Sequence, residues 1–136
     1  MLTGMANYYS SSRTNFFAVK SGAAFTEAMA KLGVEVCDGE EADTYYLRGD
    51  GEGGWPHWLE DEETGEDIEF DFIELVAEHL ADGHVAVFME AGAEKLRYIV
   101  GSAVAINNKS ERAEISLEDI YDGARGLGAH CTRCEY

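Results

Sequence analysis

The sequence predicts a single domain of the α+β class, with two layers, a mostly antiparallel sheet and about three helices. Strand-like segments are grouped, and three segments of ten or so residues space their apolar residues as helices do. The length of 136 residues is typical of one domain. An apolar content of 46%, with seven Tyr, six Phe and two Trp, is sufficient for a packed core. We expect one domain over 1–136, with loose termini at 1–6 and 128–136.

The chain is predicted to begin with a strand and a helix. Residues 15–19 (N-F-F-A-V) are aromatic and β-branched, which is typical of a strand. Ser21 is a suitable N-cap for the helix that follows, and Gly33 is a natural stop. The helical spacing i, i+3, i+4 and i+7 places four apolar residues on one face: Phe25, Ala28, Met29 and Leu32.

Short strands and a glycine-rich loop are expected next. Segments 34–37 and 44–48 are predicted strands joined by an acidic turn over 38–43. Residues 49–54 (G-D-G-E-G-G) predict a loop. The loop lacks the Lys and Ser/Thr of a phosphate-binding loop, and its acids would repel phosphate. An edge strand is expected over 55–60, where apolar and other side chains alternate.

A hairpin leading into a helix is the clearest local pattern. Thr64-Gly65 predicts the turn. The return strand over 67–72 should present one apolar and one acidic face, since carboxylates occupy alternate positions: Asp67, Glu69 and Asp71. Asp71 with Glu74 forms a plausible capping pair for the next helix, which Gly83 should end. The apolar face of that helix is predicted to hold Phe72, Leu75, Val76, His79 and Leu80.

The C-terminal part predicts a strand pair and a last helix. Residues 84–90 are apolar on both faces, as in a central strand. A turn over 91–94 should connect them to a long strand over 96–106, forming a hairpin. Ser116 is the expected cap of the last helix, which Gly126 and Gly128 end. Its inward residues are predicted to be Leu117, Ile120, Tyr121 and Ala124.

The charge is strongly negative and unevenly distributed. Ten Lys and Arg against 27 Asp and Glu give a net charge of −17. Between 49 and 94 the chain holds fifteen acids and no Lys or Arg. This argues against direct binding to nucleic acid or to an anionic membrane, because both require a cationic surface. No 18-residue apolar run and no basic, apolar leader occur, so we expect a cytosolic protein.

The acidic segment is the predicted partner-binding surface. Carboxylates at alternate strand positions lie about 6.6 Å apart, and those at i and i+4 of a helix rise about 6 Å. Both intervals are comparable with phosphate spacing along a nucleic-acid strand, so a row of them could mimic a polyanion; the alternative is an ordinary solvated surface. The candidate residues are Glu60, Asp61, Glu62, Glu63, Glu66, Asp67, Glu69, Asp71, Glu74, Glu78 and Asp82.

Metal or catalytic chemistry has little support in the sequence. Cys131-x-x-Cys134 beside His130 is half of a zinc site, and Cys37 would complete it only if the fold brought it near. Acid spacing does not match an EF-hand, and no Gly-x-Ser-x-Gly motif occurs. We therefore expect no catalytic residues, no metal and no cofactor, with a small metal-dependent module or enzyme using the cysteine pair as an alternative.

Two segments resemble small uncharacterised proteins of phages and plasmids: N-Y-Y-S-S-S-R-T-N-F-F-A-V at 7–19 and E-K-L-R-Y-I-V-G at 94–101. In size and charge the chain also resembles the acidic inhibitors that mobile elements direct against host restriction or CRISPR systems. The resemblance implies a non-enzymatic inhibitor, monomeric or homodimeric, whose partner is a basic nucleic-acid-binding protein such as a nuclease or CRISPR effector subunit. An immunity protein against a basic toxin is the alternative.

Overall fold

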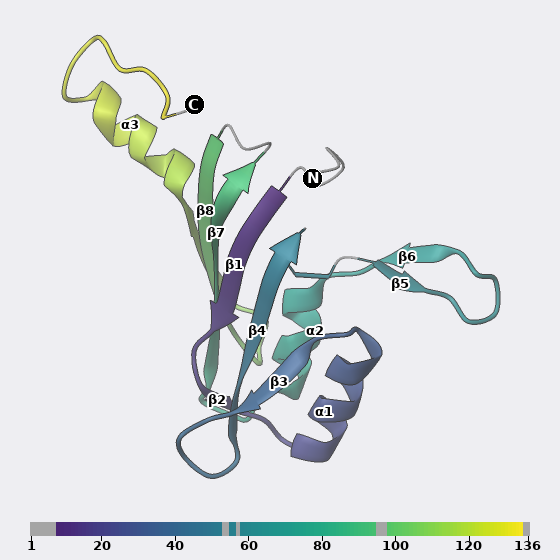
Figure 1. Ribbon diagram of the computed structural model, residues 1–136. Helices are drawn as coiled ribbons and strands as arrows, with labels where there is room; N and C mark the ends of the chain where they lie inside the picture. Colours follow the sequence, from purple (N-terminus) through teal and green to yellow (C-terminus); the bar gives the residue numbers. More distant parts are fainter. Residues whose placement is uncertain (1–7, 53–54, 57, 95–97, 135–136) are drawn as a thin grey trace.

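The computed structural model describes residues 8–52, 55–56, 58–94 and 98–134, and within them it confirms the α+β fold. Seven strands form one antiparallel sheet in the order β2-β4-β1-β7-β8-β9, with β3 also paired to β4, and β5 pairs with β6 separately. Helices α1 and α2 lie on one side of the sheet, and α3 extends from its far end (Figure 1). The strands are β1 (Tyr8–Thr14), β2 (Phe17–Ala18), β3 (Glu35–Asp38), β4 (Thr44–Glu52), β5 (Trp58–Glu60), β6 (Asp67–Glu69), β7 (Val85–Glu94), β8 (Tyr98–Asn107) and β9 (Arg112–Ser116). The helices are α1 (Gly22–Lys31), α2 (Phe72–His79), the 3₁₀ turn η1 (Leu117–Asp119) and α3 (Ile120–Arg125).

The strand expected over 15–19 is present only as the two residues of β2, and the longer strand before it, β1, was not predicted. Asn15 explains the break between the two strands. Its side-chain amide donates to the Val85 carbonyl at 2.9 Å and accepts from the Val87 N–H at 2.8 Å. In a regular strand, backbone groups would form the bonds that the Asn15 side chain forms here. The regular pairing of the strand therefore stops at this residue.

Strand β4 continues to Glu52 through most of the segment that was predicted as a loop over 49–54. Gly49 is needed there for close approach, since the Ser12 hydroxyl donates to its carbonyl at 2.8 Å. A Cβ at this position would lie 2.8 Å from that hydroxyl oxygen. The glycine therefore permits strand packing instead of marking a loop. Residues 53–54 lie outside the described part of the chain.

Helix α1 confirms its predicted cap and buried face. The Ser21 hydroxyl accepts from the Ala24 N–H at 3.2 Å, and Phe25 and Met29 are fully buried. Gly33 follows with a φ of +71°, the left-handed conformation that glycine adopts without steric cost. The strand pair that was predicted over 34–37 and 44–48 is present as β3 and β4.

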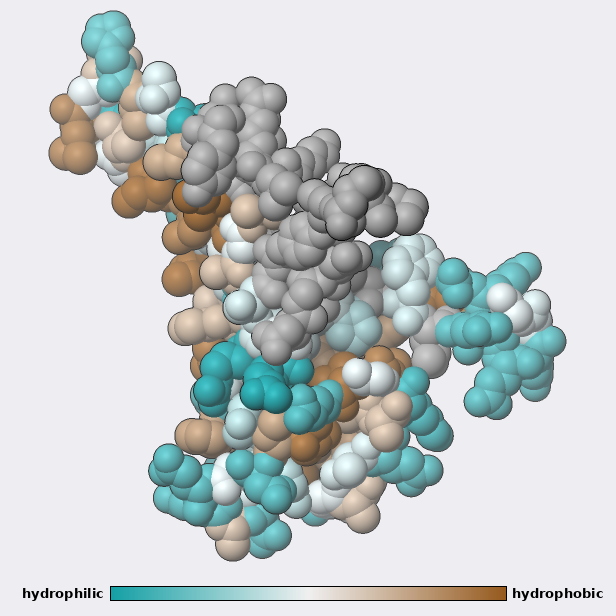
Figure 2. All heavy atoms as spheres, viewed as in Figure 1, coloured by the Kyte–Doolittle hydropathy of each residue, from teal (hydrophilic) through white to brown (hydrophobic). Residues whose placement is uncertain are grey.

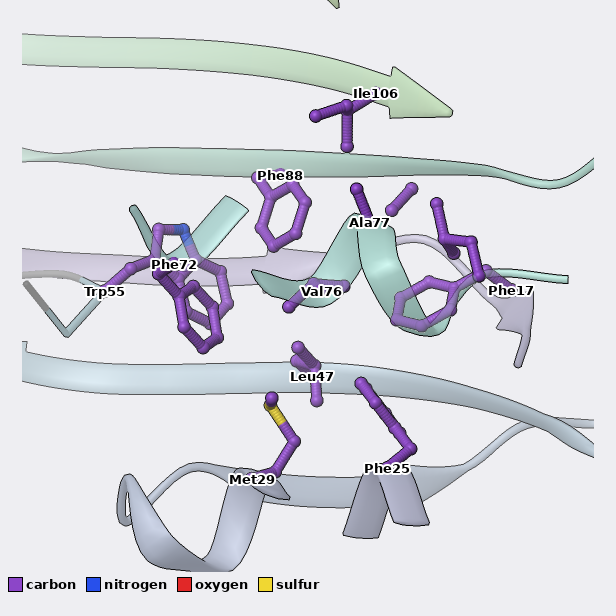
Figure 3. Packing of buried hydrophobic residues seen from close by; sticks show 12 residues of the cluster. Phe17, Phe25, Met29, Leu47, Trp55, Phe72, Val76, Ala77, Phe88 and Ile106 are labelled. Carbon is purple, nitrogen blue, oxygen red and sulfur yellow. The ribbon is translucent and has the colours of Figure 1, made fainter. Parts of the chain in front are cut away.

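The core lies between α1, α2 and one face of the sheet (Figure 3). Asp71 caps α2 by accepting from the N–H groups of Ile73 and Glu74 at 3.1 and 3.2 Å. Trp55 was predicted to begin an edge strand, but it belongs to no strand. It is buried, and its ring stacks on that of Phe72 with the ring centroids 5.5 Å apart. The other core residues are Phe17, Phe25, Met29, Leu47, Val76, Ala77, Leu80, Ala86, Phe88 and Ile106.

Helix α2 ends at His79, before the predicted stop at Gly83. The chain pairs with the segment after β2 instead: the Lys20 N–H donates to the His79 carbonyl at 2.8 Å, and the Ala81 N–H to the Ala18 carbonyl at 3.0 Å. A backbone held by these long-range bonds cannot continue the helical pattern. Gly83, with a φ of +81°, forms the turn into β7.

Strand β7 is central, as predicted, and pairs with β1 and β8. The turn expected over 91–94 is wrong, because β7 runs to Glu94, which pairs with Tyr98 of β8. The apolar residues on the two faces of this strand are not equally buried. Ala86 and Phe88 are buried, whereas Met89 on the opposite face is 58% exposed. Strand β9 has no counterpart among the predicted elements.

The last helix was predicted to turn its apolar residues inward, and the structure contradicts this. Ser116 does cap η1, through a bond from the Glu118 N–H at 3.2 Å. Leu117 and Ile120, however, are 52% and 67% exposed. The segment begins at the outermost strand, β9, and runs away from the sheet, so no core of this chain lies beneath it (Figure 1). Among the described residues, no helix has the length and apolar character needed to cross a membrane.

Because the core lies on one side of the sheet, we expect substitutions at two isoleucines to differ sharply in their effect on the free energy of unfolding. Ile106→Ala removes a side chain that is 1% exposed, and we expect it to lower the free energy of unfolding by about 2–5 kcal/mol. Ile68→Ala, at a site 48% exposed on β6, should cost less than about 1 kcal/mol. Urea denaturation measures both. Equal losses would contradict the placement of the core.

Candidate protein-binding surface

Strands β5 and β6 form a two-stranded hairpin that projects from the body of the protein (Figure 1). Glu60 pairs with Asp67, and Trp58 pairs with Glu69. Directly paired residues lie on the same face, so three carboxylates share one face of the hairpin with Trp58. Of the acidic face that was predicted from alternation, Asp67 and Glu69 are therefore present and Glu60 is added from the neighbouring strand, whereas Asp71 lies beyond β6 as the N-cap of α2.

The apolar face that was predicted for the return strand is buried only beyond β6, where Phe70 packs against the core and Phe72 belongs to it. Strand β6 ends at Glu69, and all three of its residues are exposed, including Ile68 at 48%. Strands β5 and β6 pair only with each other among the described strands, and every side chain of theirs whose burial is described is exposed. An isolated two-stranded hairpin has marginal stability in water.

The turn of the hairpin confirms the prediction at Thr64-Gly65. The Asp61 carboxylate accepts from the Glu63 N–H at 2.9 Å, and the Gly65 N–H donates to the Asp61 carbonyl at 2.8 Å. Gly65 has a φ of +72°. Asp61 thus maintains the turn, while Glu62 and Glu63 are exposed to solvent.

The hairpin carboxylates have no counter-charge in the described part of the chain, where no ion pair includes any of them. Figure 2 shows this arm as a mostly hydrophilic surface. Like charges directly opposite each other destabilise a strand pair. Glu60 and Asp67 are such a pair, so their repulsion destabilises the hairpin. The seven acids of the arm are Glu60, Asp61, Glu62, Glu63, Glu66, Asp67 and Glu69.

In the helical part of the predicted acidic row, two carboxylates share one counter-charge within the chain, a third accepts from a neutral amide, and a fourth is exposed. Arg112 of β9 pairs with Asp71 at 2.6 Å and with Glu74 at 3.3 Å. Burial acts to lower the pKa of Arg112, but its hydrogen bonds to these two carboxylates outweigh burial and raise that pKa above its ordinary value. Asp82 accepts from the Asn108 side-chain amide at 2.6 Å. Glu78 is exposed on α2.

The row is thus divided between an arm with unpaired acids and a helix end whose acids bind β9. The sequence contained no signal for the Arg112 contacts, because they join residues about forty positions apart through a strand that was not predicted.

Comparisons of the chain with protein-family models, curated proteins and solved structures found no match.

The C-terminal cysteines do not assemble a visible metal site. Cys131 and Cys134 are exposed, whereas Cys37 is half-buried on β3. Among the described residues no three His, Cys, Asp or Glu side chains are grouped so as to hold a metal ion. His84 accepts from the Ala18 N–H at 3.2 Å, and His79 packs against Phe25, so both have structural contacts.

The tail, expected to be loose over 128–136, is fixed to the last helix in its described part. Arg133 pairs with Glu118 and lies over the Tyr121 ring at 5.1 Å, and the Cys134 N–H donates to the Tyr121 hydroxyl at 2.7 Å. The hydrogen bond from Arg133 holds the pKa of Glu118 below its ordinary value.

This contact predicts a pH dependence. Because the pKa of Glu118 is lowered in the folded protein, the tail contact is complete above the ordinary carboxyl pKa and is lost as the pH falls. Arg133→Gln should return the pKa of Glu118 towards its ordinary value, as measured by NMR titration of its carboxyl carbon. Arg125→Gln, which removes a partner of Asp122, is the control and should leave Glu118 unchanged. An unchanged Glu118 titration in Arg133→Gln would contradict the contact.

Proposed function

We propose that this chain is a non-enzymatic acidic inhibitor of a mobile element that binds a basic nucleic-acid-binding surface of a host defence effector, of the anti-CRISPR or anti-restriction type. The observation that carries the proposal is the β5–β6 hairpin. It presents seven carboxylates on an exposed arm, and none of them enters an ion pair in the described part of the chain.

The hairpin geometry suits a cationic partner. Glu60 and Asp67 are directly opposite, so their Cβ atoms lie about 5 Å apart, and Asp67 and Glu69 are separated by about 6.6 Å along the strand. These intervals are comparable with the separation of neighbouring phosphates on a nucleic-acid strand. A basic groove that holds nucleic acid could hold this face instead.

The acidic hairpin is less stable than a hairpin without like-charge repulsion, and this supports a binding role. Like charges oppose hairpin pairing, and the described apolar side chains Trp58 and Ile68 are exposed, so their burial does not offset the repulsion. A basic surface would relieve the repulsion on contact. Opposite charges also accelerate association, and both effects weaken as salt increases.

The contact surface proposed from the structure is smaller than the one predicted from the sequence. Asp71 and Glu74 bind Arg112, and Asp82 binds Asn108, so these acids stabilise the fold. The contact then consists of the hairpin acids, with Asp61 maintaining the turn.

Four substitutions in the hairpin should abolish partner binding without unfolding the protein. The variant is Glu60→Gln, Glu66→Gln, Asp67→Asn and Glu69→Gln, which spares the Asp61 turn. The matched control removes four charges from the end of β3 and the turn that follows it: Asp38→Asn, Glu40→Gln, Glu41→Gln and Asp43→Asn. Asparagine suits position 43, where φ is 61°.

The measurement is affinity capture from nuclease-treated bacterial lysate at about 0.15 M and 0.5 M salt, read by mass spectrometry. We expect the wild type and the control to retain a nucleic-acid-binding protein at low salt, added duplex DNA to displace it, and the hairpin variant to lose it. Equal retention by the hairpin variant, or no nucleic-acid-binding protein retained by the wild type, would contradict the proposal. Retention of a basic toxin instead of a defence effector would favour an immunity function.

A further inference from the structure

The described end of the chain turns back beside α3 and is held there by two side chains (Figure 1). Arg133 forms an ion pair with Glu118 and lies over the ring of Tyr121. The Tyr121 hydroxyl accepts from the Cys134 N–H at 2.7 Å. Contacts on two successive residues, 133 and 134, therefore fix the course of this tail.

Two thiols lie within the fixed segment. Cys131 and Cys134 are both free and both exposed, whereas Cys37 is half-buried on β3. The Cys131 thiol donates to the carbonyl of its neighbour Thr132 at 3.7 Å. Two exposed thiols separated by two residues are accessible to an oxidant, and the second can react with the first once the first is oxidised.

The backbone of this segment is not the one that a disulfide between the two cysteines requires. A disulfide holds its Cα atoms about 4.4–6.8 Å apart, a distance that residues three positions apart reach when the chain turns. Residues 131–134 form no turn. In a turn over these residues, the N–H of the fourth would donate to the carbonyl of the first. The Cys134 N–H donates to the Tyr121 hydroxyl instead, so the turn and the tail contact compete for one donor.

We propose that Cys131 and Cys134 form a redox switch. Oxidation by a hydroperoxide to an intramolecular disulfide detaches the tail from η1 and α3, and reduction by a thiol restores the contact. The switch uses a different part of the chain from the acidic hairpin and does not depend on the inhibitor function.

Hydrogen peroxide supplies the oxidising equivalents. The thiolate of one cysteine attacks a peroxide oxygen, so the O–O bond breaks, hydroxide leaves and a sulfenic acid forms. The thiolate of the other cysteine attacks that sulfur, so the S–S bond forms, the S–O bond breaks and a second hydroxide leaves. The two thiol protons and the two hydroxides give two waters. The cysteines lose two electrons to the peroxide, and two molecules of a small thiol return them by thiol–disulfide exchange, ending as their own disulfide.

Release of the tail changes the surface around η1 and α3. Between this segment and the sheet lies a groove of about 1070 Å³, whose lining includes Leu117, Ile120, Tyr121 and Cys134. Leu117 and Ile120 are 52% and 67% exposed even with the tail attached. Detachment removes the Cys134 wall of the groove and separates Glu118 from Arg133. The disulfide form thus exposes more apolar surface than the dithiol form.

A metal site explains the cysteine pair less well than a disulfide does. A structural zinc site takes four ligands, and two thiolates supply only half of them. Within 8–52, 55–56, 58–94 and 98–134, no three His, Cys, Asp or Glu side chains are grouped so as to hold a metal ion. A disulfide requires the two thiols alone.

The tail contact and the redox state must influence each other equally. A contact that exists only in the dithiol form stabilises that form, so its removal should favour the disulfide. Tyr121→Phe keeps the ring but removes the hydroxyl that accepts from Cys134. At equilibrium with reduced and oxidised glutathione, this variant should shift the ratio of disulfide to dithiol upwards about fivefold, as expected for the loss of one hydrogen bond. Arg125→Gln, on α3 but outside the tail contact, is the matched control and should leave the ratio unchanged.

NMR titration of Glu118 follows the tail directly. In the reduced protein, the hydrogen bond from Arg133 holds the pKa of Glu118 below its ordinary value. After oxidation with hydrogen peroxide, that pKa should return towards its ordinary value, as in Arg133→Gln. Cys131→Ser, treated in the same way, should keep the lowered pKa, whereas Cys37→Ser should respond as the wild type does.

Mass spectrometry of proteolytic peptides locates the disulfide, and circular dichroism confirms the fold of each variant. Arg133→Gln replaces Tyr121→Phe in the glutathione equilibrium if the latter does not fold. The proposal would be overturned if peroxide forms no disulfide between Cys131 and Cys134, or if that disulfide leaves the Glu118 titration unchanged. An unchanged glutathione equilibrium in the folded contact variant would also overturn it.

Discussion

The contact between α2 and one face of β7 and β8 determines where the rest of the chain lies. Phe72 of α2 stacks on Trp55 and meets Phe88 edge-on at 6.1 Å. Because Trp55 and Phe72 flank the β5–β6 hairpin in the sequence, burying both anchors its base and leaves its strands outside. The same contact brings the start of α2 to β9, where Arg112 binds the cap residue Asp71.

One-sided packing also explains how charge and apolar surface are separated. The seven acids of the hairpin enter no ion pair among the described residues, whereas near α2 the single charge of Arg112 is shared by Asp71 and Glu74. Exposed apolar side chains lie instead on the far side of β7 and β9, at Met89 and Ile115. The acidic arm and these apolar residues thus belong to different elements of the fold.

Features that depend on residues close in the sequence, such as helix caps, could be predicted. Which apolar faces are buried by other elements of the fold could not. Ser21, Phe25 and Met29 specified α1 because a cap and a helical spacing act within a few residues. Asn15 interrupts a strand through bonds to residues seventy positions away, which no local pattern reveals. Ile120 and Met89 follow amphipathic patterns, but such a pattern does not say whether the same chain supplies the covering layer. The acidic hairpin was predictable from composition and turn chemistry, whereas the pairing of Asp71 and Glu74 depended on β9.

The central claim is that the hairpin is an arm for binding and that the fold does not need it. Replacing residues 58–69 by a short Gly-Ser linker tests this directly, because Trp58 and Glu69 are cross-strand partners and their Cα atoms lie about 5 Å apart. Thermal unfolding, followed by circular dichroism, is the measurement. A cooperative transition within about 4 °C of the wild-type midpoint is predicted, since no core residue is removed. Loss of the transition, or a much lower midpoint, would show that the hairpin stabilises the core and would contradict the account.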